Sequence, residues 1–222
     1  MLIAEDLLLL LTDPESGRLL VPAQHADIAL GGALLVELSV AGRVVVDDRK
    51  RLQVAGHGAV TDPVLADALR TVAGKAGRKP KTVMSPLSKG IRATTYRRLA
   101  AAGVLREQRT RVLGLFPQTR WPAADAHPRA VLLDALVQVL VTGTTPTATT
   151  GALVGLLVAM RATHQVVDPR EHRIGRRTLD RRAGQVAEGD WASSAVRSAI
   201  DAAQAAMTAA IVASTSVVVT SG

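Results

Sequence analysis

The residues best suited to chemistry are a small set of basic and aromatic side chains in the middle of the chain. Lys89 and Arg92 lie three positions apart in a segment that we expect to be helical, and Tyr96 lies one turn beyond Arg92. Arg120 and Trp121 follow in a segment expected to be a loop. Arginine binds phosphate groups through paired hydrogen bonds, so this set predicts a site for an anionic ligand. The same charges would also suit an ordinary solvated helix face.

Motifs for catalysis, metal binding or cofactor binding are missing from the sequence. The chain has no cysteine, which excludes disulfides and thiolate chemistry. None of its five histidines matches a zinc-binding or metalloprotease spacing. There is no nucleophile elbow, phosphate-binding loop or dinucleotide fingerprint, and the pair Asp47-Asp48 is typical of a turn. We therefore expect no enzyme activity, no metal and no cofactor.

Positive charge is concentrated in two segments of the chain, whose net charge is +8. Residues 75–129 hold thirteen lysines and arginines against two acidic residues, and residues 170–182 hold six against two. A concentrated basic segment predicts an anionic partner, which could be a membrane, a nucleic acid or an acidic protein. A solvated basic surface without a partner is the alternative.

The pattern of apolar residues predicts a mainly α protein. We expect a compact helical bundle domain with one or two short β-hairpins, forming a single domain over residues 1–222. Residues 26–41 are apolar almost all round, which predicts a central helix, and Gly31-Gly32 would let another element approach it closely. Thr61-Asp62-Pro63 predicts a helix start and Gly103 a helix end. Further helices are expected over 3–11, 85–103, 129–141, 149–163, 169–187 and 191–213 (the last capped by Asp190), hairpins over 44–54 and 104–116, a short strand over 19–21 and a loop over 116–128.

No segment is predicted to span a membrane or to direct export. Glu5 and Asp6 interrupt the apolar start of the chain, unlike in a secretory signal. Residues 131–141 and 151–160 are very apolar but shorter than the roughly 20 residues that a spanning helix needs. The uncharged tail 202–222 is rich in Ala, Ser and Thr, which insert weakly into a bilayer. We expect a cytoplasmic protein, and the lack of cysteine agrees with this.

Four parts of the chain, taken in order, form a wider pattern. They are IAEDLLLLLTDPESGRLL; IALGGALLVELSVAGRVVV; GIRATTYRRLAAAGVL with the hairpin and proline-rich loop after it; and ALVGLLVAM with an arginine-rich helix and AEGDWASSAVRSAI. This ordered set resembles the Golgi phosphoprotein 3 family over essentially the whole chain, and the bacterial branch of that family most of all.

The resemblance implies a mostly helical globule that associates with membranes from the cytoplasmic side. It implies binding of phosphatidylinositol 4-phosphate at a basic pocket on a flat, membrane-facing surface. In eukaryotes it also implies an adaptor that holds glycosyltransferases in the Golgi, so client proteins are possible partners. The hairpin, here 104–116, serves self-association in some members.

The resemblance also implies which residues form the pocket. The family pocket has two basic residues three apart on the helix that ends in Gly-Val-Leu, and these correspond to Lys89 and Arg92 here. The third arginine of the pocket falls on Gly31, and its tryptophan falls near Val21 or Pro22. Two of the family's pocket residues are therefore lost in this chain.

We therefore expect a non-catalytic, peripheral membrane protein that binds phosphoinositides or other anionic lipid head groups through a basic face. Arg120 and Trp121 are the candidates to take the place of the missing pocket residues. Anionic membrane lipids are the expected partners, with self-association and client proteins in addition.

Two alternatives stay open at this point. One is a winged-helix-like nucleic-acid-binding protein, because a helix, a tight turn and a basic hairpin follow one another over 86–116. Thr94, Thr95, Arg97 and Arg98 would then contact the groove and the phosphates. The other is a protein-interaction module without lipid binding, in which the hairpin edge pairs with a partner.

Overall fold

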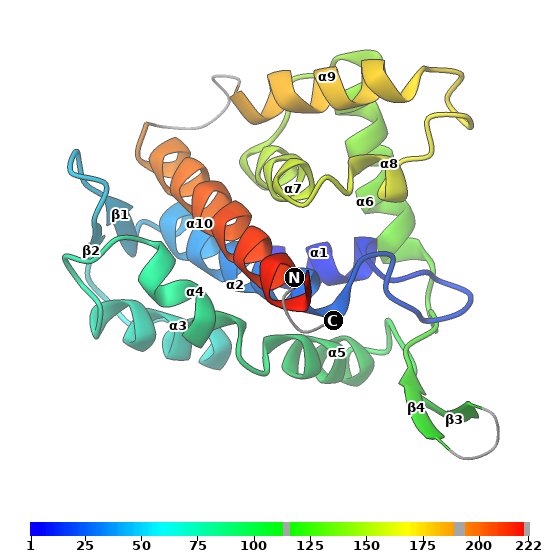
Figure 1. Ribbon diagram of the computed structural model, residues 1–222, viewed down its shortest axis with the longest axis horizontal. Coiled ribbons are helices and arrows are strands. Elements are labelled where there is room, and N and C mark those ends of the chain that lie inside the picture. The colour runs from blue at the N-terminus through cyan, green and yellow to red at the C-terminus, as the bar shows by residue number, and fades with distance from the viewer. Residues whose placement is uncertain (113–115, 189–193, 220–222) are drawn as a thin grey trace.

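The structure, a computed structural model, describes residues 1–112, 116–188 and 194–219, and it confirms a mainly helical fold (Figure 1). The helices are α1 (Ile3–Leu10), α2 (Ala23–Val40), α3 (Pro63–Ala73), α4 (Lys81–Ser88), α5 (Ile91–Ala101), α6 (His127–Val137), α7 (Ala148–Ala159), α8 (Thr163–Val166), α9 (Arg176–Glu188) and α10 (Ser194–Val219). The π-helical segment η1 (Gln138–Thr142) continues α6. The strands β1 (Val44–Val46), β2 (Leu52–Val54), β3 (Gln108–Val112) and β4 (Phe116–Arg120) form two antiparallel hairpins.

Helix α2 lies at the centre of the molecule, as its apolar sequence predicted. It is buried on nearly every side, with α1, α4, α7 and α10 packed around it, and Figure 1 shows α10 running across it. A Cβ atom on Gly31 would lie 2.8 Å from the Ser88 Oγ atom, and one on Gly32 would lie 2.5 Å from the Met207 Sδ atom. Because interiors are close-packed, the missing side chains at these two positions set how closely α4 and α10 approach α2.

One arginine ties three helices together beside the start of α1. Glu5 and Asp6 of α1 are only 7 % and 8 % exposed. The Arg98 Nε atom of α5 lies 2.6 Å from the Glu5 Oε1 atom, and its Nη2 atom lies 2.8 Å from the Asp62 Oδ2 atom. Asp62 also caps α3 by accepting hydrogen bonds from two backbone amides, which confirms the predicted helix start. Arg98 therefore links α1, α3 and α5.

The first hairpin lies where it was predicted, but the second does not. We predicted a hairpin over 104–116, whereas Gln108–Val112 pairs with Phe116–Arg120, Gln108 opposite Arg120. In Figure 1 this hairpin projects away from the helices. Arg120 therefore lies at the end of strand β4 and not in a loop.

Burial of the residues after α5 explains this shift. Gly103 has a left-handed backbone (φ +74°) and ends the helix as predicted. Val104 and Leu105 follow at once and are buried in the core, where Leu105 bridges to Ala123. The strands can begin only after the chain has left the core.

The helix predicted over 85–103 is divided in two. Lys89 is extended and Gly90 is left-handed, with φ +72°. A left-handed residue cannot continue a right-handed helix, so α5 starts afresh at Ile91. Helix α4 begins at Lys81, earlier than the predicted Ser85-Pro86 start.

Other predicted boundaries also moved. Arg161, at φ +55°, follows the end of α7, so the helix predicted over 149–163 is cut short. The helix predicted from 169 begins at Arg176. Leu19 forms an isolated bridge with Thr12 and not a strand. The predicted cap Asp190 lies outside the described residues, and none of the helices inside them is long and apolar enough to cross a bilayer.

The buried acid at the start of α1 gives a pH-dependent prediction. Burial raises the pKa of Asp6 to about 6; the N-terminal amino group opposes this rise, and the carboxylates of Glu37 and Glu5 add to it. Between about pH 4 and pH 6 Asp6 is protonated in the folded protein but ionised in the unfolded chain, so the cost to stability grows over this range and stays constant above it, while below about pH 4 both states are protonated. We predict that Asp6→Asn raises the free energy of unfolding by about 2–3 kcal/mol at pH 7.5. That gain should shrink as the pH falls from about 6 to about 4.

Urea unfolding of both proteins across this pH range makes the measurement. Asp48→Asn, at an exposed position, is the matched control and should change stability little at any pH. A gain in Asp6→Asn that does not depend on pH would contradict the explanation.

Candidate anion-binding site

Arg92 lies in the first turn of α5 and reaches across to α2. Its Nε and Nη2 atoms lie 2.8 Å and 3.4 Å from the Oδ1 and Oδ2 atoms of Asp27. About a third of each side chain stays exposed. Two parallel contacts fix the plane of the guanidinium group, so Arg92 is held in one orientation while part of it faces solvent.

An aromatic pair lies one turn beyond Arg92. The rings of Tyr96 and Trp121 are stacked, with centroids 4.9 Å apart and planes 4° apart. Tyr96 is buried, its hydroxyl lies 3.0 Å from the Thr12 Oγ1 atom, and burial raises its pKa, so it stays a neutral phenol. The stack holds Trp121, which directly follows β4, against Tyr96 of α5.

A tight turn at residues 13–17 completes this side of the site. The Trp121 amide donates a hydrogen bond of 3.1 Å to the Gly17 carbonyl. Gly17 is left-handed (φ +64°), and a Cβ atom there would lie 2.4 Å from the Trp121 backbone nitrogen, so only glycine fits. Asp13 accepts hydrogen bonds from the hydroxyl and amide of Ser16, which hold the pKa of its carboxyl below the ordinary value. The turn places Arg18 beside the aromatic pair.

These elements surround a hollow of about 410 Å³ whose charged lining consists of three arginines. It is lined by Gly17, Arg18, Leu19, Arg92, Tyr96, Gln118, Thr119, Arg120 and Trp121. Asp27 offsets the charge of Arg92, so a net positive charge remains for an anion. The structure thus brings together Arg92, Arg120 and Trp121, three of the four residues predicted from the sequence. Sequence reasoning missed Arg18, although the turn before it was recognisable.

Lys89, the fourth predicted residue, lies elsewhere. It is exposed in the break between α4 and α5 and lines a smaller hollow of about 150 Å³ together with Asp67, Thr71 and Thr94. The predicted pairing with Arg92 assumed a continuous helix. Because the helix starts only after Lys89, a spacing of three residues does not place the two charges at one hollow.

The positions of the two lost pocket residues differ in their surroundings. Val21 is buried, whereas Pro22 is exposed directly before α2. Gly31 packs against the end of α4, where an added Cβ atom would contact Ser88 and Leu87. The lost arginine therefore has no open space at Gly31. Within the described residues, no group of three or more acidic or histidine side chains could hold a metal ion.

The chain matches the model of a known protein family. A family model described as Golgi phosphoprotein 3 (GPP34) matches residues 3–203, from the start of α1 into α10. It therefore includes every residue that lines the arginine hollow. No curated protein matches the chain.

The packing at Gly31 gives a prediction about the lost arginine. We predict that Gly31→Arg lowers the free energy of unfolding by about 1–3 kcal/mol, because the new side chain would collide with the end of α4. An added Cβ atom would lie 2.8 Å from the Ser88 Oγ atom and 3.1 Å from its backbone nitrogen. Urea unfolding measures the change.

Gly184→Arg in α9 is the matched control for this substitution. A Cβ atom there would meet nothing within 4 Å, so we expect a neutral or stabilising effect from better helix propensity. If Gly31→Arg were as stable as the original protein, the position would be open and the steric argument wrong.

Proposed function

The chain belongs to the Golgi phosphoprotein 3 family, and we propose that it is a peripheral membrane protein that binds anionic lipid head groups, with phosphatidylinositol 4-phosphate as the preferred ligand. We further propose that it acts without catalysis, as an adaptor between a membrane and client proteins. The observation that carries the lipid proposal is the convergence of Arg18, Arg92 and Arg120 on one hollow.

The chemistry of the hollow favours a phosphate monoester. Such a group carries between one and two negative charges near neutral pH and offers several acceptor oxygens. Arginines already held in place bind it with the least loss of side-chain freedom. Arg92 is held by Asp27, and the Arg120 Nε atom lies 3.3 Å from the Gln118 Oε1 atom. Arg18 is exposed and would close over the bound phosphate.

Basic residues outside the hollow would add a general attraction to an anionic surface. Arg97 of α5 and Arg106, which lies between α5 and β3, are both exposed. A basic residue near an anionic membrane adds about 1 kcal/mol. Trp121 is partly exposed at the edge of the hollow, and tryptophan favours the membrane–water boundary.

Contacts inside the protein argue against the nucleic-acid alternative. Arg98 is engaged by Glu5 and Asp62, and Thr95 is buried with its hydroxyl donating to the Ile91 carbonyl. Two of the four residues required for nucleic-acid contact are therefore already engaged in contacts within the protein. Within the described residues each strand of the hairpin, now placed at 108–120, has one edge without a partner strand. Self-association through such an edge would not exclude lipid binding.

Vesicle co-sedimentation tests the proposed site. We predict binding to vesicles containing phosphatidylinositol 4-phosphate and weaker binding to vesicles with phosphatidylserine or phosphatidylinositol at equal charge. Arg92→Gln and Arg120→Gln should each weaken the preferred binding about tenfold, since one charge-assisted contact is worth about 1.5–3 kcal/mol. Lys89→Gln, outside the hollow, should have a smaller effect. No binding to any vesicle, or equal losses in all three variants, would contradict the proposal.

Asp27 gives a prediction of opposite sign. Asp27→Asn keeps an oxygen that accepts the hydrogen bond from Arg92, and so keeps its orientation, but removes the charge that competes with the ligand. We predict that this variant increases binding to vesicles with phosphatidylinositol 4-phosphate about threefold, while Arg92→Gln decreases it. Both variants break the same ion pair, so a purely structural role would weaken binding in both. Co-sedimentation at several salt concentrations measures the difference.

A further inference from the structure

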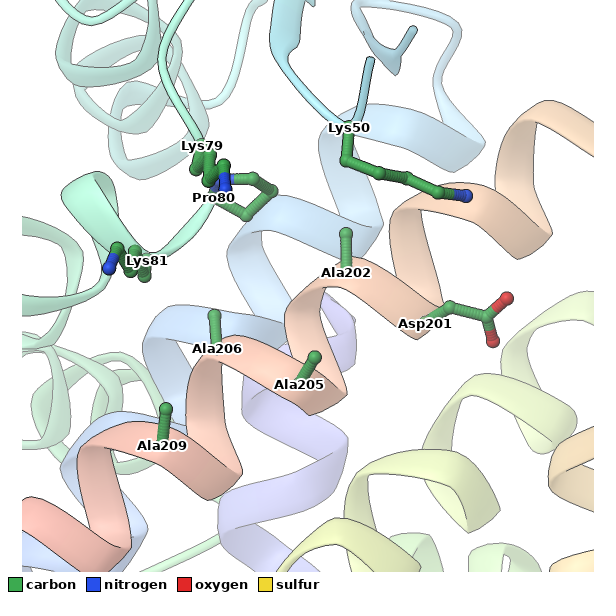
Figure 2. Close-up of a pocket in the computed structure, with 9 residues that line it drawn as sticks. All are labelled: Lys50, Lys79, Pro80, Lys81, Asp201, Ala202, Ala205, Ala206 and Ala209. Atoms are coloured by element: carbon green, nitrogen blue, oxygen red, sulfur yellow. The ribbon is translucent and has the colours of Figure 1, made fainter. Parts of the chain in front are cut away.

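An apolar floor lies along α10, away from the arginine hollow. Four alanines recur on one side of the helix at intervals of three and four residues: Ala202, Ala205, Ala206 and Ala209. Figure 2 shows them beneath Lys50 and Pro80. The groove between these parts holds about 410 Å³, which is within the range of small-molecule sites. Methyl groups offer no hydrogen bonds, so the floor suits an apolar ligand group.

Three lysines from two segments line the rim of this groove. Lys50 lies in the turn between β1 and β2, while Lys79 and Lys81 flank Pro80 where α4 begins. In Figure 2 the Lys50 side chain reaches over α10, whereas Lys81 points away from it. In the described parts of the chain the ion pairs are all formed by arginines, so no described carboxylate neutralises these lysines. Asp201 lies on α10 across the alanines from Lys79 and Lys81, on the side toward which the Lys50 side chain extends.

Backbone hydrogen bonds hold the two lysine-bearing segments together. The Leu52 amide donates to the Arg78 carbonyl at 2.8 Å, and the Gly77 amide donates to the Leu52 carbonyl at 2.7 Å. Lys50 itself has a left-handed backbone (φ +57°), which is uncommon for lysine, and its amide donates to the Asp47 carbonyl at 2.8 Å. The backbone positions of Lys50 and Lys79 relative to each other are therefore fixed before any ligand arrives.

We infer that this groove binds a single-chain anionic amphiphile, meaning one alkyl chain with a carboxylate or phosphate head. The alkyl chain lies on the alanine floor, and the head lies near Lys50 and Lys79. Asp201, which lies across the alanines from Lys79, repels the head and so directs it toward Lys79. An ammonium group is a point charge without the paired geometry of arginine, so the site selects charge and chain but not one particular head group. The groove shares no residue with the arginine hollow and does not depend on its function.

Calorimetric titration with three probes separates the contribution of the ligand's charge to binding from that of its alkyl chain. Dodecyl phosphate, below its micelle concentration, should bind with one molecule per protein. Inorganic phosphate lacks the chain and dodecyltrimethylammonium reverses the charge, so both should bind at least tenfold more weakly. Equal binding of dodecyltrimethylammonium would overturn the inference, and so would a failure of dodecyl phosphate to bind.

Groove-filling variants test the location of the bound chain. Ala205 and Ala209 are exposed, so Ala205→Leu and Ala209→Leu fill the groove without disturbing the core. Each should weaken binding of dodecyl phosphate about tenfold, while Ala101→Leu, on the exposed end of α5, should leave it unchanged. Circular dichroism verifies that all variants fold.

Charge variants test the lysine rim. Lys50→Gln combined with Lys79→Gln should weaken binding of dodecyl phosphate at least tenfold, and Lys75→Gln, at an exposed position outside the groove, should not. If Arg92→Gln abolishes binding of dodecyl phosphate while the groove variants leave it unchanged, the probe binds at the arginine hollow and the inference about the groove is wrong.

Discussion

The close packing of α2 is the constraint on which the rest of the structure depends. A helix with apolar residues all round must be covered on every side, and Gly31 and Gly32 let α4 and α10 come close enough to do so. Both candidate sites follow from this arrangement. The lysine groove lies between α10 and the start of α4, and the Asp27–Arg92 ion pair fixes α5 to α2.

Arginine serves two different purposes in this protein. Arg98 links three helices. Arg182 of α9 donates hydrogen bonds to the Leu140 and Val141 carbonyls in η1. Carbonyl groups at the end of a helix have no amide of the same helix as a donor, so Arg182 takes that place. Arg18 and Arg120 instead face a hollow. Arg92 combines both purposes, because its ion pair with Asp27 holds the helices and also orients it toward the hollow. Counting charges along a segment therefore overestimates how many are available to a ligand.

The arginine hollow and the lysine groove differ in the kind of cationic side chain and in the residues that form their walls. The first combines guanidinium groups with a rigid aromatic stack, an arrangement suited to the oxygens of one phosphate group. The second combines ammonium groups with a floor of methyl groups, an arrangement suited to a chain with a charged end. A protein with both could contact the head group of one lipid and the chain of another amphiphile at separate places.

The sequence by itself determined the elements whose signals are local. The apolar run of α2, the first hairpin, the Asp62 cap and the Gly103 end all depend on neighbouring residues, and all were predicted. The ordered motifs also identified the family, which the family model matches over residues 3–203. The tertiary structure decided the composition of the site. Lys89 is separated from Arg92 because Gly90 takes a left-handed conformation, and Arg18 joins Arg120 because Gly17 packs against Trp121. The second outcome depends on a contact between distant segments, which local spacing does not encode. The first is a local helix break at a glycine, where a continuous helix was predicted.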